Sequence, residues 1–185
     1  EDTMVTYADV AVIANPGASE RRAEIPGAEL AVRSLGYRIA RITAPGTLDG
    51  GDVLKHDRTV WVGVGDRTNS EGARQLAAAL EPLGARVVEV PISKVLHLKS
   101  AVTALPDGTV LGHPSFVDDP SVFGKYLEVP EPDGAHVVLL NEDRLLISAS
   151  APKTADLLAE RGYTPVAVDI SEFEKLEGCV TCLSV

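Results

Sequence analysis

Two cysteines near the C-terminus are the chain's candidates for covalent chemistry. Cys179 and Cys182 lie within its last ten residues, and the sequence contains no other cysteine. A thiol acts as a nucleophile when a base elsewhere in the sequence activates it. Two other interpretations stay open, since a cysteine pair also serves as buried hydrophobic residues, or as a redox dithiol or half of a zinc site. Because Gly178 precedes the β-branched Val180 and Thr181, we expect a turn that enters a strand and holds the thiol rigidly.

The base that such a thiol needs is expected among the four histidines of the chain. His97 lies between Leu96 and Leu98, on what the apolar pattern predicts to be a buried strand over residues 95–98. It is therefore either a core histidine with a satisfied hydrogen bond or a general base. The other three occupy predicted turns or loops: His56, His113 and His136.

Two acids and two arginines are further candidates for a polar site. Asp49 and Asp52 flank a pair of glycines, which allow another part of the backbone to approach closely. The alternatives for this acidic segment are a solvated turn or a weak cation site. Arg21 and Arg67 follow predicted strands and are either surface charges or a pair that binds a carboxylate bidentately.

Composition narrows the function classes. A length of 185 residues suits one domain, and the net charge of -10 disfavours nucleic acid and anionic membranes while matching a cationic ligand. No apolar run approaches the roughly 18 residues of a membrane span, and no signal peptide is visible. Two cysteines are too few for a disulfide scaffold, so we expect a reducing compartment, the cytoplasm. Since the chain opens at Glu1 without an initiator Met, we also expect it to be a fragment or a processed chain.

The elements that must position these residues form a repeat. Pairs of strands followed by a helix and a third strand are predicted over residues 4–42, 53–90 and 137–168, and a helix-poor copy is predicted over 95–130. The period is about 45–50 residues. This ββαβ order excludes a plain doubly wound sheet and favours a repeated α/β module, either stacked or closed in a ring.

The motifs together resemble those of the dimethylarginine dimethylaminohydrolases. Residues 48–52 (LDGGD), 67–72 (RTNSEG) and 96–99 (LHLK) and the Cys182 tail stand in the same order as in that family. The resemblance covers essentially the whole chain. It implies a pentein-type α/β propeller of ββαβ modules and a single catalytic domain over residues 1–185. It also implies that this chain lacks the family's N-terminal module, which carries a lid loop and one more substrate aspartate.

The resemblance implies a role for each matched residue. Cys182 resembles the nucleophile, His97 the general acid/base, and Asp49 the carboxylate that supports the histidine, where the family often has Glu. Cys179 is left without a role. Asp2 resembles the residue that binds the substrate guanidinium. The residues that hold the amino-acid end or line the site are implied to be Glu1, Arg21, Arg67, Thr181 and the backbone of Leu176.

The implied activity is hydrolysis of asymmetric dimethylarginine or monomethylarginine to citrulline and a methylamine, through a covalent cysteine S-alkylthiouronium intermediate. The substrate is a small cationic amino acid, no metal or organic cofactor is expected, and a homodimer is compatible with the resemblance. Two alternatives stay open, an arginine deiminase-like hydrolase and a non-catalytic guanidino-binding pentein fragment. Lys99 favours a methylated substrate, because arginine deiminases commonly carry an acid at that position.

Overall fold

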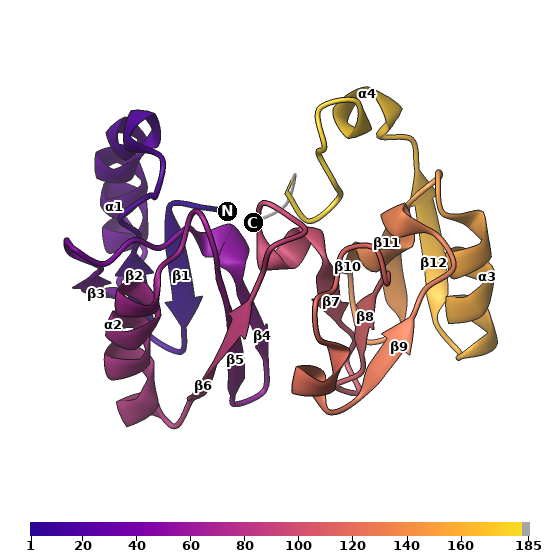
Figure 1. Cartoon of the computed structure of the whole chain (residues 1–185), viewed down its shortest axis with the longest axis horizontal. Helices are drawn as coiled ribbons and strands as arrows, with labels where there is room; N and C mark the ends of the chain where they lie inside the picture. The colour runs from indigo at the N-terminus through magenta and orange to yellow at the C-terminus, as the bar shows by residue number, and fades with distance from the viewer. Residues whose placement is uncertain (183–185) are drawn as a thin grey trace. The chain divides into compact units, whose positions relative to one another are not determined.

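Four three-stranded sheets follow one another along the chain in the computed structural model, which describes residues 1–182 (Figure 1). In each sheet the first two strands pair antiparallel, and the third strand joins the second in parallel. Three of the four modules have an α-helix between the second and third strands. The predicted ββαβ repeat is therefore confirmed, including the helix-poor copy.

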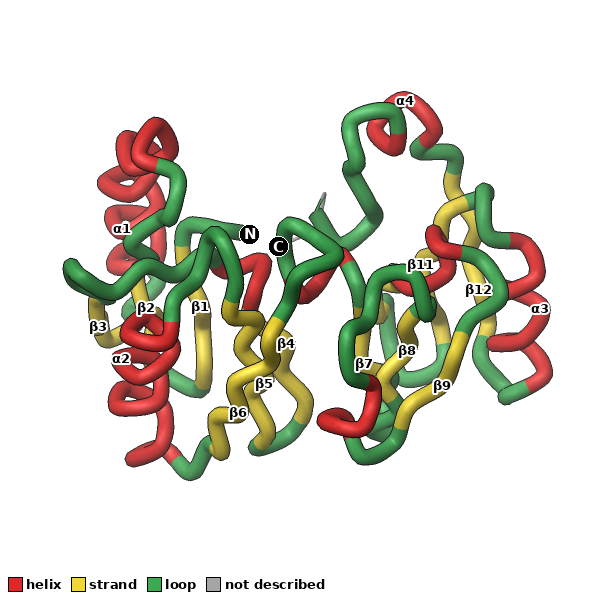
Figure 2. Tube along the Cα trace, viewed as in Figure 1, coloured by secondary structure: helices red, strands yellow, loops and turns green. Residues whose placement is uncertain are grey.

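The element bounds are as follows (Figure 2). The first module contains β1 (Met4–Tyr7), β2 (Val10–Ile13), α1 (Ile25–Ser34) and β3 (Arg38–Arg41). The second contains β4 (Val53–His56), β5 (Thr59–Val64), α2 (Ser70–Leu80) and β6 (Arg86–Pro91). The third contains β7 (Val102–Ala104), β8 (Val110–Gly112) and β9 (Tyr126–Glu128). The fourth contains β10 (Val137–Leu139), β11 (Arg144–Ser148), α3 (Pro152–Glu160) and β12 (Thr164–Val168), and α4 (Ser171–Glu174) follows it. Short 3-10 helices include η1 (Ser19–Glu24), η2 (Gly50–Asp52), η4 (Leu98–Ser100) and η5 (Pro120–Phe123).

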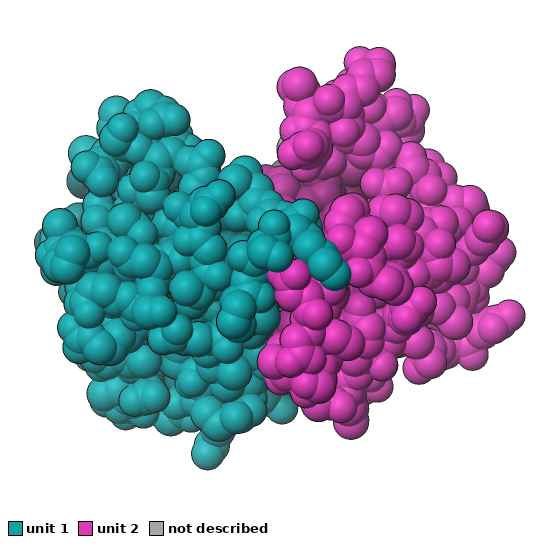
Figure 3. Space-filling view, viewed as in Figure 1, with its two compact units in different colours: residues 1–98 teal, residues 99–185 magenta. Residues whose placement is uncertain are grey.

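The modules belong to two compact units, residues 1–98 and residues 99–185 (Figure 3). Each unit contains two modules. The single catalytic domain expected over the whole chain stays a prediction.

The first unit is organised around the second strand of each module. All four residues of β2 are buried, and β5 is buried over residues 60–63, since both faces of these strands are covered. Val12, Val62 and Leu76 are all fully buried in one core that joins the two modules and α2. Figure 1 shows α1 and α2 along one side of this unit, with β1, β4 and β5 toward the other.

The second unit repeats this arrangement around β8 and β11. Leu111, Leu145, Ile147 and Leu158 form its core, and each is fully buried. The third module lacks an α-helix because the segment between β8 and β9 contains prolines and Gly124, which has a positive φ. Only η5 forms there, capped by the side chain of Asp119. A helix-poor copy of the module was expected over residues 95–130, but the strand β9 itself was not predicted from the sequence.

Two predicted strands do not form. Residues 95–97 lie in a loop, and η4 begins at Leu98, because the Leu98 N–H donates to the Asp52 carboxylate instead of to a neighbouring strand. Residues 178–182 form a turn after α4, and the Gly178 N–H donates to the carbonyl of Phe173. The prediction of a buried strand for His97 is therefore wrong, and so is the predicted strand of the cysteine tail as far as residue 182; residues 183–185 of that prediction lie outside the described residues. Among residues 1–182, no helix has the length and apolar character that crossing a membrane requires.

Two glycines at equivalent helix positions should respond oppositely to a methyl group. Gly27 and Gly72 are the third residues of α1 and α2. A Cβ on Gly72 would overlap the backbone of Thr47, whereas a Cβ on Gly27 would meet nothing within 4 Å. Gly72→Ala should lower the free energy of unfolding by about 1–3 kcal/mol, since the packed backbone has to move. Gly27→Ala should raise it by about 0.5–1 kcal/mol through helix propensity.

Urea denaturation of the two variants and the unaltered protein checks this prediction. Equal effects of the two substitutions would contradict the packing of α2 against the Thr47 backbone.

Candidate active site

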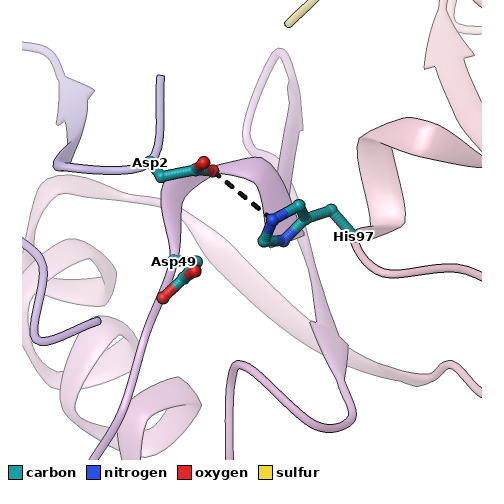
Figure 4. Close-up of side chains that lie close together, drawn as sticks. All are labelled: Asp2, Asp49 and His97. Carbon is teal, nitrogen blue, oxygen red and sulfur yellow. Dashed lines mark ion pairs between the residues drawn. The ribbon is translucent and has the colours of Figure 1, made fainter. Parts of the chain in front are cut away.

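His97 lies among three carboxylates in the first unit, those of Asp2, Asp49 and Asp52, and we call these four residues the His97 cluster. Figure 4 shows His97 with Asp2 and Asp49. The His97 side chain is 11% exposed. Its Nε2 lies 3.9 Å from Asp2 Oδ1, and its Nδ1 lies 3.5 Å from Asp52 Oδ1. One ligand atom each of Asp2, Asp49 and His97 lie within 4.8 Å of one another. A buried imidazole in such surroundings favours its protonated form.

The glycine pair between Asp49 and Asp52 makes this packing possible. A Cβ on Gly51 would lie 2.6 Å from Asp2 Oδ1 and 2.9 Å from His97 Cγ. The Gly51 N–H donates to Asp2 Oδ1 at 2.8 Å, and the Gly50 N–H donates to the Asp2 carbonyl at 2.9 Å. The close backbone approach that the sequence predicted for these glycines is therefore present, and any side chain at Gly51 would displace Asp2 or His97.

Asp49 is fully buried and only partly satisfied. Its Oδ1 accepts the Gly17 N–H at 2.9 Å, while its Oδ2 has no hydrogen-bond partner. Burial raises the pKa of Asp49 above its usual range, and the negative charges of Asp2 and Asp52 add to this effect. A carboxylate in this state favours a nearby positive charge.

Asp2 has the opposite electrostatic environment. Its Oδ2 pairs with Arg21 Nη1 at 2.5 Å, and Arg21 also pairs with Glu24. Burial opposes ionisation of Asp2, but the Arg21 hydrogen bond and the nearby His97 together lower the pKa of Asp2. The resemblance places Asp2 and Arg21 at opposite ends of one substrate, and such binding requires their ion pair to open.

His97 is affected in the opposite direction. Burial opposes the charged form of His97, yet Asp52, Asp2 and Asp49 together raise the pKa of His97.

Arg67 and Glu1 lie on segments next to the cluster. A Cβ on Gly17 would lie 2.8 Å from the Cα of Arg67, so the loop after β2 touches the loop after β5. Arg67 itself is half-buried. The Glu1 carbonyl lies against Gly50. The backbones of Arg67 and Glu1, two of the predicted binding residues, thus contact the loops that carry the His97 cluster.

The cysteine pair belongs to the second unit. Cys179 Sγ lies 3.0 Å from Cys182 Sγ and 3.0 Å from Thr181 Oγ1. Cys179 is buried, Cys182 is exposed and Leu176 is 86% exposed. The Cys182 contact lowers the pKa of Cys179 to about 5, against the opposing effect of burial. Because the thiols share this contact, the first ionisation belongs to the pair, which makes a thiolate available near neutral pH.

The cluster geometry suits a cation. Two carboxylates and an imidazole that converge within 4.8 Å match either a metal ion or a guanidinium group. The Asp2–Arg21 pair already shows a guanidinium bound to one of these carboxylates. The expectation that no metal or organic cofactor is needed stays a prediction.

Two residues of the site were missed as contributors by the sequence analysis. Thr68 is fully buried and bonds to both flanking acids of the glycine pair, accepting from the Asp49 N–H and donating to Asp52. Asp52 was recognised as a candidate acid but received no role. A threonine between a loop arginine and a helix cap gives no signal of such burial, because solvated threonines are common in loops.

Known proteins similar to this chain point to one family. A family model described as arginine deiminase matches residues 32–143. The N(G),N(G)-dimethylarginine dimethylaminohydrolase of Streptomyces coelicolor is 65% identical over 185 residues, covering 100% of this chain and 72% of that protein. The protein of the same name from Pseudomonas aeruginosa is 36% identical over 189 residues, covering 100% of this chain and 74% of its own length.

Solved structures agree with these sequences. A cysteine-to-serine DDAH mutant of Pseudomonas aeruginosa complexed with citrulline has a TM-score of 0.90 at 34% identity, covering 98% of this chain and 72% of that one. The N-terminal domain of a cyanobacterial arginine dihydrolase has a TM-score of 0.88 at 21% identity, covering 100% of this chain and 73% of that one, and supports the fold alone. The α/β fold of repeated modules expected from the resemblance is confirmed.

Asp2 and Asp49 should shift the pH dependence of stability in opposite directions. Because the folded state lowers the pKa of Asp2 below its usual 3.8, ionised Asp2 stabilises the fold above that pH, and this contribution disappears as pH falls through the lowered pKa. Asp2→Asn should therefore lower the free energy of unfolding at neutral pH. Because the folded state raises the pKa of Asp49, ionised Asp49 destabilises the fold at neutral pH. Asp49→Asn should therefore raise the free energy of unfolding at neutral pH.

Urea denaturation from neutral pH to about pH 3 checks both signs, and both differences should shrink on acidification. If both variants destabilise the protein equally at neutral pH, the electrostatic account of the cluster is wrong.

Proposed function

This chain belongs to the dimethylarginine dimethylaminohydrolase family of the pentein superfamily, and we propose that it hydrolyses Nω-methylated arginine to citrulline and a methylamine. The observation that carries this proposal is the His97 cluster, in which a buried imidazole lies among the carboxylates of Asp2, Asp49 and Asp52. Such a cluster binds a cation and supplies a proton-transfer group beside it.

In the proposal, carboxylates hold the substrate guanidinium. A guanidinium is planar and cationic, and its central carbon is a poor electrophile because its charge is delocalised. Asp2 forms charge-assisted hydrogen bonds to its nitrogens and fixes the orientation of the carbon. The unpartnered Oδ2 of Asp49 adds a further negative charge that favours a cation over a neutral ligand.

Cys182 is the proposed nucleophile. Its thiolate forms an S–C bond to the guanidinium carbon, and the bond from that carbon to the methylated nitrogen breaks. His97 gives a proton to the departing nitrogen, so dimethylamine or methylamine leaves as a neutral amine and an S-alkylthiouronium remains on the cysteine. Cys179 Sγ lies 3.0 Å from Cys182 Sγ, so the thiol of Cys179, or a serine hydroxyl in its place, can donate a hydrogen bond to the Cys182 thiolate.

Water completes the reaction. The imidazole of His97, which is neutral after the first step, takes a proton from water while the water oxygen forms a bond to the same carbon. The C–S bond then breaks, and the cysteine leaves as a thiolate. The second proton of the water is released to solvent, and the new C–O bond becomes the ureido carbonyl of citrulline. No metal or organic cofactor is required by these steps.

Arginines and a lysine set the proposed specificity. Arg21, Arg67 and Glu1 hold the amino-acid end of the substrate, and Thr181 and the Leu176 backbone line the site. Lys99 stands where arginine deiminases commonly have an acid that binds the second guanidinium nitrogen. Without that acid, the nitrogen has room for methyl groups. An arginine deiminase activity is the second candidate, because the family model described as arginine deiminase matches residues 32–143.

We also propose a cytoplasmic location, because neither cysteine forms a disulfide and the proposed nucleophile requires a reduced thiol. The proposed partner is the small-molecule substrate. A homodimer is compatible with the family and carries no part of the mechanism.

Citrulline release from different substrates tests the function directly. Asymmetric dimethylarginine should be hydrolysed faster than arginine, and its decarboxylated analogue should be a very poor substrate because Arg67 then has no carboxylate to bind. Loss of a charge-assisted contact costs about 2–3 kcal/mol, which is roughly 30- to 150-fold in kcat/KM. Arg67→Ala should reduce this discrimination, mainly by weakening the amino-acid substrate.

Arg58→Ala serves as the matched control, since Arg58 is an exposed arginine in the β4–β5 turn. Faster release of citrulline from arginine than from dimethylarginine would favour an arginine deiminase activity instead. Equal turnover of the decarboxylated analogue would remove the role given to the arginines.

The two thiols should differ sharply in their effect on turnover. Cys182→Ser should abolish citrulline release while dimethylarginine still binds, because the carboxylates and arginines remain. Cys179→Ser should retain most activity, since Cys179 forms no bond to substrate. Steady-state kinetics and calorimetric titration of each variant measure these outcomes. If Cys179→Ser is inactive, or if both variants lose the same activity, the nucleophile assignment is wrong and the redox dithiol interpretation is favoured.

A further inference from the structure

Asp52 is a fully buried carboxylate that the proposed chemistry leaves without a task. Its two oxygens face different groups. Oδ2 accepts the Thr68 hydroxyl at 2.6 Å, and Oδ1 accepts the Leu98 N–H at 3.0 Å. The same Oδ1 lies 3.5 Å from His97 Nδ1. One carboxylate therefore contacts both the backbone and the side chain of the segment that carries the imidazole.

The Thr68 hydroxyl fixes the direction of these hydrogen bonds. It accepts the Asp49 N–H at 3.1 Å, and its single hydrogen is donated to Asp52. Because Asp52 accepts hydrogens at both oxygens, the group facing His97 is a hydrogen-bond acceptor. The ring nitrogen on that side, Nδ1, is buried and has no hydrogen bond of full strength. A proton on Nδ1 therefore matches the acceptor, and Nε2 is left to face Asp2.

Asp49 is less suited to this task in the structure. One of its oxygens accepts the Gly17 N–H, and the other has no hydrogen-bond partner. The resemblance assigns the support of the histidine to Asp49, but Asp52 is the carboxylate within 3.5 Å of Nδ1. Asp52 also holds the backbone of the next residue.

We propose that Asp52 is a positioning residue for His97: its carboxylate, oriented by Thr68, keeps the imidazole in the tautomer with hydrogen on Nδ1 and directs Nε2 toward the reacting atoms. The effect on catalysis rests on the proposed function, whereas the effect on the imidazole does not. Asp52 does not touch the substrate and acts through His97 alone.

Nitrogen-15 NMR of histidine-labelled full-length protein tests the position of the proton, and His97→Gln identifies the His97 signals among the four histidines. In the unaltered protein, neutral His97 should show hydrogen on Nδ1. Asp52→Asn should lower the pKa of His97 and mix the two tautomers. The groups that face the ring are Asp2, Asp49 and Asp52, so Asp49→Asn is the comparison. The matched control is Asp9→Asn, an exposed acid beyond the other end of β1.

Kinetics give a second readout. Asp52→Asn should lower kcat by about 100-fold, the scale of a lost general acid/base, with little change in KM. Thr68→Val removes the hydroxyl and keeps the shape, so it should shift the pKa of His97 in the same direction by less. If Asp52→Asn fails to fold, Thr68→Val decides the question.

The proposal is overturned if Asp52→Asn, or Thr68→Val in its place, leaves the tautomer and pKa of His97 unchanged. It is also overturned if Asp49→Asn disturbs the ring more than Asp52→Asn does. Inactivity of the unaltered protein toward dimethylarginine would instead remove the proposed function, and the NMR result would still judge the role of Asp52.

Discussion

The packing of three carboxylates around one imidazole is the constraint on which the first unit depends. Like charges this close repel one another, and burial adds the cost of desolvation. The structure offsets these costs with backbone donors from Gly17, Gly51 and Leu98 and with the Thr68 hydroxyl. One acceptor, Oδ2 of Asp49, is left without a donor. Such unpaired buried negative charge lowers the free energy of unfolding, and it favours the cation that the proposed function requires.

The repeated module explains why these donors converge. Gly17 follows β2, Thr68 follows β5 and Leu98 follows β6, so each lies in the loop beyond the carboxyl end of a strand. An isolated bridge between Asn15 and Leu48 ties the first of these loops to the segment that leads into the glycine pair. Because β5 and β6 are parallel, the loops that follow them emerge at the same end of the second sheet, where sites commonly form. The loop after β2 reaches this end through the contact of Gly17 with the backbone of Arg67. The modules supply a rigid frame, and the loops supply the chemistry.

The sequence predicted the regular parts of this structure well. The ββαβ modules predicted over residues 4–42, 53–90 and 137–168 are confirmed, because apolar periodicity and helix caps are local signals. The segment around His97 was predicted as a strand because its residues are apolar, but it forms a loop. The Leu98 N–H donates to the buried carboxylate of Asp52 and is therefore not available to a neighbouring strand. No local pattern reveals an acceptor that lies 46 residues away in the chain. The same limit hid the role of Thr68, and it explains why a strand was predicted for residues 180–182, which form a turn.

The central claim is that a cysteine of the tail attacks the guanidinium carbon with the help of His97. The most direct test is mass spectrometry of proteolytic peptides after acid quenching during turnover of asymmetric dimethylarginine. The account predicts that the peptide with Cys182 gains the mass of the substrate less that of dimethylamine, and that His97→Gln forms little of this addition because it lacks the group that protonates the departing amine. An addition on Cys179, or no covalent addition under conditions of measured citrulline release, would contradict it.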